Sequence, residues 1–144
     1  LLNKIGKEVK EKYGGFDLVM DDGGHHMKHQ LTSLKVLSSY MKPISKYIIE
    51  DIETSYYKEF GGGPIGTPNT FINLLKNLID VINRDFTEGQ YKSKEIVKKR
   101  GERKRRDVVD FSIINNDDKI FSMEIFPNCA ILNFGYKELY MTSR

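Results

Sequence analysis

The chain has 144 residues, of which 39% are hydrophobic, and this suits a single domain with one core. Its one cysteine, Cys129, excludes a disulfide framework and a cysteine-rich zinc site, and favours a reducing, cytoplasmic location. No apolar run approaches the ~20 residues of a membrane span, and the formal net charge of +3 conceals one strongly basic segment at 92–106.

The first predicted elements alternate between helix and strand. Apolar side chains four residues apart predict an amphipathic helix over residues 1–13, ended by two glycines. Residues 16–20 form a short apolar run, which is typical of a parallel strand buried on both faces. A second helix is predicted from about His25 to Lys42, because the residue before Pro43 disfavours helical geometry.

A second strand, a third helix and a hairpin follow. Residues 44–49 predict the strand, and a loop rich in glycine and proline leads to a helix that Asn69 or Thr70 can cap. Residues 119–126 and 129–136 predict a closing hairpin. The order implies an α/β fold with parallel strands, flanking helices and a terminal antiparallel β-hairpin.

Acidic residues follow both predicted parallel strands. Asp21 and Asp22 end the first strand, and Glu50 and Asp51 end the second. Ligands bind at the carboxyl ends of strands in open α/β sheets, and consecutive strands are neighbours about two times in three. Asp22, Glu50 and Asp51 would therefore converge and bind a hard divalent cation such as Mg²⁺. For any one of these acids, helix capping is the ordinary alternative.

The histidines lie beside these acids. His25, nearest the turn, would act as a general base toward a hydroxyl held by the metal. His29 lies opposite the apolar stripe and is predicted to be exposed. His25 and His29 also have the spacing of a zinc hydrolase motif, which leaves a metal-dependent hydrolase as an alternative, although His26 stands where that motif has glutamate.

The residues around the acids resemble a known family, the metal-dependent class I S-adenosylmethionine O-methyltransferases. Within it the chain is most similar to the branch that acts on macrolide sugars, to which the cephalosporin hydroxylase-like proteins are related. The similar stretches are FDLVMDDGGHH at 16–26, His29-Gln30, YIIEDIETSY at 47–56, Phe60-Gly61-Gly62 and the hairpin at 122–135.

This resemblance implies a Rossmann-like fold and methyl transfer from S-adenosylmethionine to a hydroxyl of a small molecule such as a sugar. The hydroxyl would be oriented by Mg²⁺ or another hard divalent cation. The residues implied are Asp22, Glu50 and Asp51 for the metal, His25 as the base, Asp21, Gly23 and Gly24 for the cofactor, and Tyr56, Gly61 and Gly62 for the acceptor.

The chain departs from the family at two points. Gly24 stands where the family usually has serine. The glycine-rich turn and the acidic residue that grips the ribose lie, in the family, upstream of a helix like residues 1–13. We therefore expect the chain to be the C-terminal portion of a longer methyltransferase, lacking the cofactor-binding half, and to bind the cofactor poorly and be inactive alone.

The basic segment has two interpretations. Between residues 92 and 106 lie nine basic and two acidic residues, so the rest of the chain is net acidic. It would be a solvated loop inserted between the third helix and the hairpin. Alternatively, it would contact phosphates, as in a nucleic-acid or phosphate-binding module, although it contains almost no aromatic residues to stack on bases, Tyr91 standing just outside it. The oligomeric state stays open, a homo-oligomer included.

Overall fold

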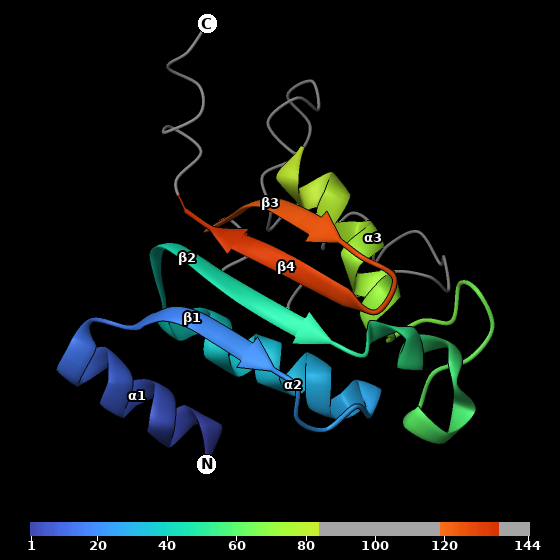
Figure 1. The fold of residues 1–144 in the computed structure, drawn as a ribbon, viewed down its shortest axis with the longest axis horizontal. Helices are drawn as coiled ribbons and strands as arrows, with labels where there is room; N and C mark the ends of the chain where they lie inside the picture. The colour runs from blue at the N-terminus through green and yellow to red at the C-terminus, as the bar shows by residue number, and fades with distance from the viewer. Residues whose placement is uncertain (84–118, 136–144) are drawn as a thin grey trace, which may run out of the picture.

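The computed structural model describes residues 1–83 and 119–135, so the predictions for residues 92–106 and 136 lie outside the described part. Three short 3₁₀ helices separate some of the regular elements: η1 (Ser38–Tyr40), η2 (Ile52–Tyr56) and η3 (Lys58–Phe60). The regular elements are α1 (Leu2–Tyr13), β1 (Phe16–Asp21), α2 (Met27–Leu37), β2 (Met41–Glu50), α3 (Phe71–Ile82), β3 (Ile120–Ile125) and β4 (Cys129–Phe134) (Figure 1).

The four strands form one mixed sheet in the order β1-β2-β4-β3. β1 and β2 pair in parallel, with Asp21 opposite Ile49, and β4 pairs antiparallel with both β2 and β3. α2 connects the two parallel strands, as a crossover helix does. The predicted α/β fold with parallel strands and a terminal antiparallel hairpin is therefore confirmed.

One face of the sheet carries the core. α2 and α3 both lie behind the sheet in Figure 1, and their side chains meet alternate residues of the strands. On the opposite face Leu18 and Met20 are 54% and 60% exposed. The prediction that β1 is buried on both faces is wrong, because the helices described cover only one. The fully buried large side chains include Leu34, Tyr47, Ile49, Phe71, Leu74, Leu75, Leu78, Leu132 and Phe134.

The boundary between α2 and β2 also differs from the prediction. α2 ends at Leu37, and Met41 begins β2, so the predicted helix was too long. Met41 is buried and pairs with Phe16 of β1, so a contact distant in the sequence places it in the sheet. Pro43 is tolerated in β2 because the β1–β2 register shifts around it, and proline is confined to such irregular positions.

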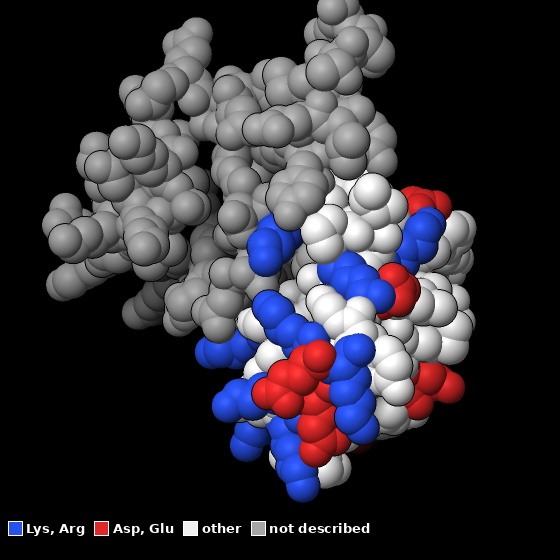
Figure 2. All heavy atoms as spheres, turned by 90° about the vertical axis from the view of Figure 1, so that its left-hand side faces the viewer, with Lys and Arg blue, Asp and Glu red and all other residues white. Residues whose placement is uncertain are grey.

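α1 packs beside the sheet against α2, η1 and β1. Gly6 allows this contact, since a Cβ there would lie 2.3 Å from the ring of Tyr40. The outer surface of α1 carries interleaved charges, among them the pair Lys4–Glu8 at 4.0 Å, and Figure 2 shows basic and acidic side chains alternating on this side. Mixed charge of this kind is typical of a solvent-facing helix.

The start of α3 follows the prediction. Thr70 caps the helix, because its side chain accepts a hydrogen bond from the amide of Asn73 at 3.3 Å. Of the helices in the described residues, none is both long and apolar enough to cross a membrane.

Candidate metal and acid–base site

The carboxyl ends of β1 and β2 lie side by side, and three side chains converge there. Asp22, His25 and Asp51 each offer a ligand atom, and these atoms all lie within 4.8 Å of one another. Asp22 follows β1, His25 lies in the turn before α2, and Asp51 follows β2. The parallel pairing of two consecutive strands thus brings together Asp22 and Asp51, two of the three acids that the sequence predicts to converge.

His25 and Asp51 are in direct contact. Nδ1 of His25 lies 2.9 Å from Oδ2 of Asp51, and both side chains are about a third exposed. A carboxylate only accepts hydrogen bonds, so Nδ1 carries the proton in this pair and Nε2 is left to accept one. The ring of Phe60 stands edge-on to the imidazole, with centroids 6.5 Å apart. The contact with Asp51 fixes the orientation of the His25 ring.

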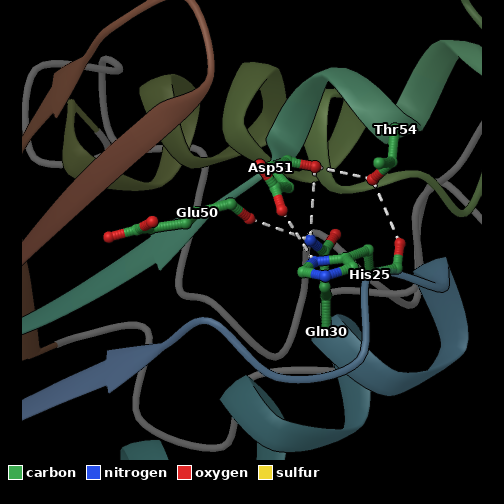
Figure 3. A network of polar contacts seen from close by, with 5 residues as sticks. All are labelled: His25, Gln30, Glu50, Asp51 and Thr54. Atoms are coloured by element: carbon green, nitrogen blue, oxygen red, sulfur yellow. Dashed lines mark hydrogen bonds and ion pairs between the residues drawn. The ribbon is translucent and has the colours of Figure 1, made fainter.

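The backbone of Asp51 has an uncommon conformation. Its φ of 53° and ψ of 39° place it in the left-handed region, which aspartate tolerates better than most residues. The next amide, of Ile52, donates to the carbonyl of Asn128 in the hairpin turn at 3.1 Å. Figure 3 shows the surrounding contacts, in which Gln30 and Thr54 bond to the backbone beside the Asp51 and His25 side chains.

The carboxylate of Glu50 lies apart from this group. Its side chain points away from His25 in Figure 3, on the face of the sheet opposite the core. Glu50 is paired with Cys129 of β4, and burial together with the charge of Glu50 raises the pKa of the Cys129 thiol. The structure thus brings Asp22 and Asp51 together, whereas Glu50 reaches them only if its side chain rotates.

Asp21 accepts a hydrogen bond from a buried tyrosine. The hydroxyl of Tyr47 donates to Oδ2 of Asp21 at 2.8 Å, and Tyr47 is fully buried. Burial, followed by the charge of Asp21 and this hydrogen bond, raises the pKa of Tyr47 far above its usual range. Tyr47 therefore stays neutral and keeps donating to Asp21, which fixes the last residue of β1 against the core.

The turn after β1 is tightly packed around its glycines. A Cβ on Gly24 would lie 2.5 Å from Nδ1 of His29, so a larger residue there would displace that ring. His29 is exposed, as predicted, and its ring lies 5.5 Å from that of His26. Because His25 precedes α2, His25 and His29 do not share one helix, and no metal-binding group within residues 1–83 and 119–135 includes His29.

The residues predicted to border the acceptor lie near the same turn. Tyr56 ends η2 and is 44% exposed. Gly61 has φ 79°, and a Cβ there would lie 2.8 Å from Cε1 of His26. Gly62 lies against the backbone of Ser55, where a Cβ would be 2.3 Å from the carbonyl oxygen. The glycine loop thus folds back over η2 toward the histidines.

Sequence reasoning assigned no role to Gln30, Thr54 or Phe60, although all three contact this site. Gln30 carries a signal that could have identified it. It is a polar residue in the buried stripe of α2 and is only 2% exposed, between Met27 and Leu34. A buried amide needs hydrogen-bond partners, and such a residue beside predicted site residues indicates a positioning role.

Comparisons with known proteins show what the chain is similar to. No family model matches the chain. It is 42% identical over 76 residues to the mycinamicin VI 2''-O-methyltransferase of Micromonospora griseorubida, and 40% identical over 75 residues to the demethylmacrocin O-methyltransferase of Streptomyces fradiae. Each match covers 51% of this chain, which spans only 19% of the length of either relative.

The fold is also found among solved structures. The methyltransferase MycE of the mycinamycin biosynthetic pathway, solved in complex with Mg, SAH and mycinamycin VI, matches with a TM-score of 0.68 and 30% identity. The match covers 94% of this chain and 29% of that chain. The chain is therefore related, in sequence and in fold, to the sugar O-methyltransferases of macrolide and polyketide pathways, and it matches a part of their length.

Proposed function

We propose that this chain takes part in divalent-metal-assisted methyl transfer from S-adenosylmethionine to a hydroxyl of a small molecule such as a sugar. The observation that carries the proposal is the convergence of Asp22, His25 and Asp51, with ligand atoms within 4.8 Å, at the carboxyl ends of two parallel strands. Two carboxylates and one imidazole in this space suit a divalent cation and a base. MycE was solved with Mg and SAH bound, which supports the same cofactors here.

The side chains present fit a hard divalent cation. Asp22 and Asp51 would hold it through carboxylate oxygens, and Glu50 would join them after rotating toward the strand ends. Such a cation would polarise a neighbouring hydroxyl and make its proton more acidic. The proposal assigns metal binding to these three acids.

His25 would remove the acceptor's proton. Its Nδ1 faces Asp51 at 2.9 Å, so Nε2 is the nitrogen that would take the proton from the hydroxyl. Asp51 would stabilise the resulting imidazolium, as an opposite charge in contact with it does. S-adenosylmethionine, when bound, would supply the methyl group: the deprotonated oxygen would bond to it, and the sulfur would keep the electron pair of the broken carbon–sulfur bond.

Two further groups of residues would place the reactants. Asp21, fixed by Tyr47, would contact the cofactor together with Gly23 and Gly24. Tyr56 and the loop at Gly61 and Gly62 would border the acceptor; the folding of this loop toward the histidines supports that role. These assignments follow the resemblance to the sugar O-methyltransferases.

Metal binding is the sharpest test for this chain. The chain spans only 19% of the length of its mycinamicin VI relative, so its metal site can be tested more directly than a whole reaction. Mn²⁺ is the probe, and free Mn²⁺ is measured by electron paramagnetic resonance. Wild type should bind Mn²⁺ saturably, and Asp22→Asn and Asp51→Asn should each weaken binding at least ~10-fold, because each removes a ligand charge.

Asp17→Asn is the matched control. Asp17 also lies on β1 but is 79% exposed and pairs with Lys42, so its substitution should leave Mn²⁺ affinity unchanged. Absence of saturable Mn²⁺ binding, or an equal loss in Asp17→Asn, would contradict the proposal. Metal binding is measured rather than methyl transfer, because the chain alone is expected to bind S-adenosylmethionine poorly.

A further inference from the structure

We propose that Gln30 and Thr54 are positioning residues that hold the backbone of Asp51 in its left-handed conformation, and so keep its carboxylate beside His25. The inference rests on the proposed function, which gives the Asp51–His25 pair its purpose. The side chains of Gln30 and Thr54 donate hydrogen bonds to the backbone carbonyls of Glu50, Asp51 and His25. Both act through the backbone of these residues.

Gln30 reaches the end of β2 from the middle of α2. Its Nε2 lies 3.1 Å from the carbonyl of Glu50 and 3.5 Å from that of Asp51. Carbonyl oxygens only accept, so the amide nitrogen must face them, and its two hydrogens serve two consecutive carbonyls. The two carbonyls that flank the Cα of Asp51 are thereby tied to α2.

The burial of Gln30 supports this role. The side chain is 2% exposed, and Oε1 has no hydrogen-bond partner in the described structure. Burying an amide is unfavourable unless its polar atoms are bonded, so the amide of Gln30 is compensated only by its bonds to the two carbonyls. A hydrophobic residue would serve packing alone better at this position.

Thr54 holds the same peptide from the other side. Its hydroxyl lies 2.6 Å from the carbonyl of Asp51, and its backbone amide lies 3.2 Å from that oxygen. The hydroxyl also lies 3.1 Å from the carbonyl of His25. Thr54 is 5% exposed, so water does not compete for these contacts. One buried side chain therefore bridges the backbones of the two residues that form the Asp51–His25 pair (Figure 3).

The conformation of Asp51 explains why such support is needed. A left-handed backbone is less unfavourable for aspartate than for most residues, but it still costs free energy compared with glycine and persists when its surroundings enforce it. An ordinary conformation would send the chain after β2 in another direction, and the carboxylate would leave the 2.9 Å contact with His25. Gln30 and Thr54 both bond the carbonyl of Asp51. Because the direction of this carbonyl depends on the ψ angle of Asp51, these bonds restrain that angle.

The test removes the donors while keeping the shape of the side chains. Gln30→Met and Thr54→Val are nearly isosteric, and each should weaken Mn²⁺ affinity ~10-fold, as loss of a group that supports a metal ligand does. Thr54→Ser keeps the hydroxyl and should restore affinity to within about twofold of wild type. Ser45→Ala is the matched control, because Ser45 is equally buried and its hydroxyl also bonds a carbonyl three residues earlier, at 2.6 Å.

A second measurement reports on the geometry without metal. In nuclear magnetic resonance spectra of the metal-free chain, Asp51 should show the backbone carbon shifts of a left-handed residue. The Nδ1 proton of His25 should resonate downfield and exchange slowly, because it is hydrogen-bonded. Both signals should be lost in Gln30→Met and Thr54→Val and retained in Thr54→Ser and Ser45→Ala.

The outcomes separate this inference from the proposed function. If wild type binds Mn²⁺ and both isosteric variants bind it equally well, the positioning role is overturned and the metal site stands. If wild type binds no Mn²⁺, the proposed function fails, and the resonances of Asp51 and His25 then decide the positioning role alone. Their persistence in both variants would overturn it, whereas their loss would support it.

Discussion

The two faces of the sheet are built from alternate residues of the same strands, yet they differ in almost every property. Toward α2 and α3, Tyr47, Leu132 and Phe134 are fully buried in one cluster. On the opposite face Leu18 and Met20 are more than half exposed. The buried contacts that stabilise the fold lie on the face toward α2 and α3, while the site lies at the carboxyl ends of β1 and β2. Asp21 is anchored to the buried face through Tyr47, and Glu50 points to the open one.

The difference between the two faces predicts that replacing a leucine by alanine destabilises the fold far more on the buried face than on the exposed one. Leu132→Ala opens a cavity in the core and should lower the free energy of unfolding by about 2–5 kcal/mol. Leu18→Ala, on the open face, should cost less than about 1 kcal/mol, because over half of the side chain is already in water. Urea denaturation followed by circular dichroism measures both. Equal losses would mean that the open face is covered in solution.

The second prediction concerns the hydrogen bond under the site. Tyr47→Phe leaves Oδ2 of Asp21 without its donor and should cost about 1–2 kcal/mol at neutral pH. Asp21 is partly exposed, so water can replace part of what is lost. Tyr40→Phe is the control, since the hydroxyl of Tyr40 bonds to Asn3 in an exposed contact. It should have a smaller effect.

Tyr47 should also give the chain a pH dependence. Its pKa is raised in the folded state, so the unfolded chain loses the tyrosine proton first, near pH 10. The stabilisation is therefore complete below about pH 10 and is lost as the pH rises above it, with a slope approaching ~1.4 kcal/mol per pH unit. Tyr47→Phe should lack this contribution. Urea denaturation at several alkaline pH values measures the free energy of unfolding of both proteins. The same dependence on pH in wild type and in Tyr47→Phe would contradict the prediction.

The sequence predicts the positions of most helices and strands, but it predicts their burial and some of their ends less well. Period and turn residues are local signals, so they locate α1, α3 and the hairpin correctly. The burial of β1 depends on what packs over each face, and the end of α2 depends on Met41 pairing with Phe16 across the sheet. Both are long-range effects, so neither could be predicted from a local pattern.

The site shows the same division. The acids follow strands, so their meeting follows from strand order, and Asp22 and Asp51 do meet. Which way each acid points depends on the pleat and on the left-handed turn at Asp51, neither of which leaves a clear signal in the sequence. The roles of these residues, and that of Glu50 above all, stay predictions.

The charges on the open face should contribute little. Lys46 and Glu124 lie 3.8 Å apart, and each is about half exposed. Water and salt screen such pairs, so Lys46→Ala should change the free energy of unfolding by less than about 0.5 kcal/mol. Urea denaturation at low and high salt measures it. A larger, salt-dependent loss would show that the open face is less accessible to water than its exposure indicates.

The smallest predicted effect reports where Glu50 points. Cys129 faces Glu50 across the β2–β4 pair, and burial and the carboxylate both raise the pKa of its thiol, so the reactive thiolate is scarce. Glu50→Gln removes the charge and should speed the reaction of Cys129 with a disulfide reagent at pH 8 about twofold. Glu8→Gln, on the distant helix α1, should leave the rate unchanged.

Repeating the reaction of Cys129 with saturating Mn²⁺ tests whether Glu50 leaves the exposed face of the sheet to bind the metal. If Glu50 turns to join Asp22 and Asp51 around the cation, its charge leaves Cys129, and the wild-type rate should rise to that of Glu50→Gln. The Glu50→Gln rate should not respond to Mn²⁺ in this way, because it has no charge to withdraw. Saturable Mn²⁺ binding with an unchanged wild-type rate would show that Glu50 stays on the open face and that two carboxylates, not three, hold the metal.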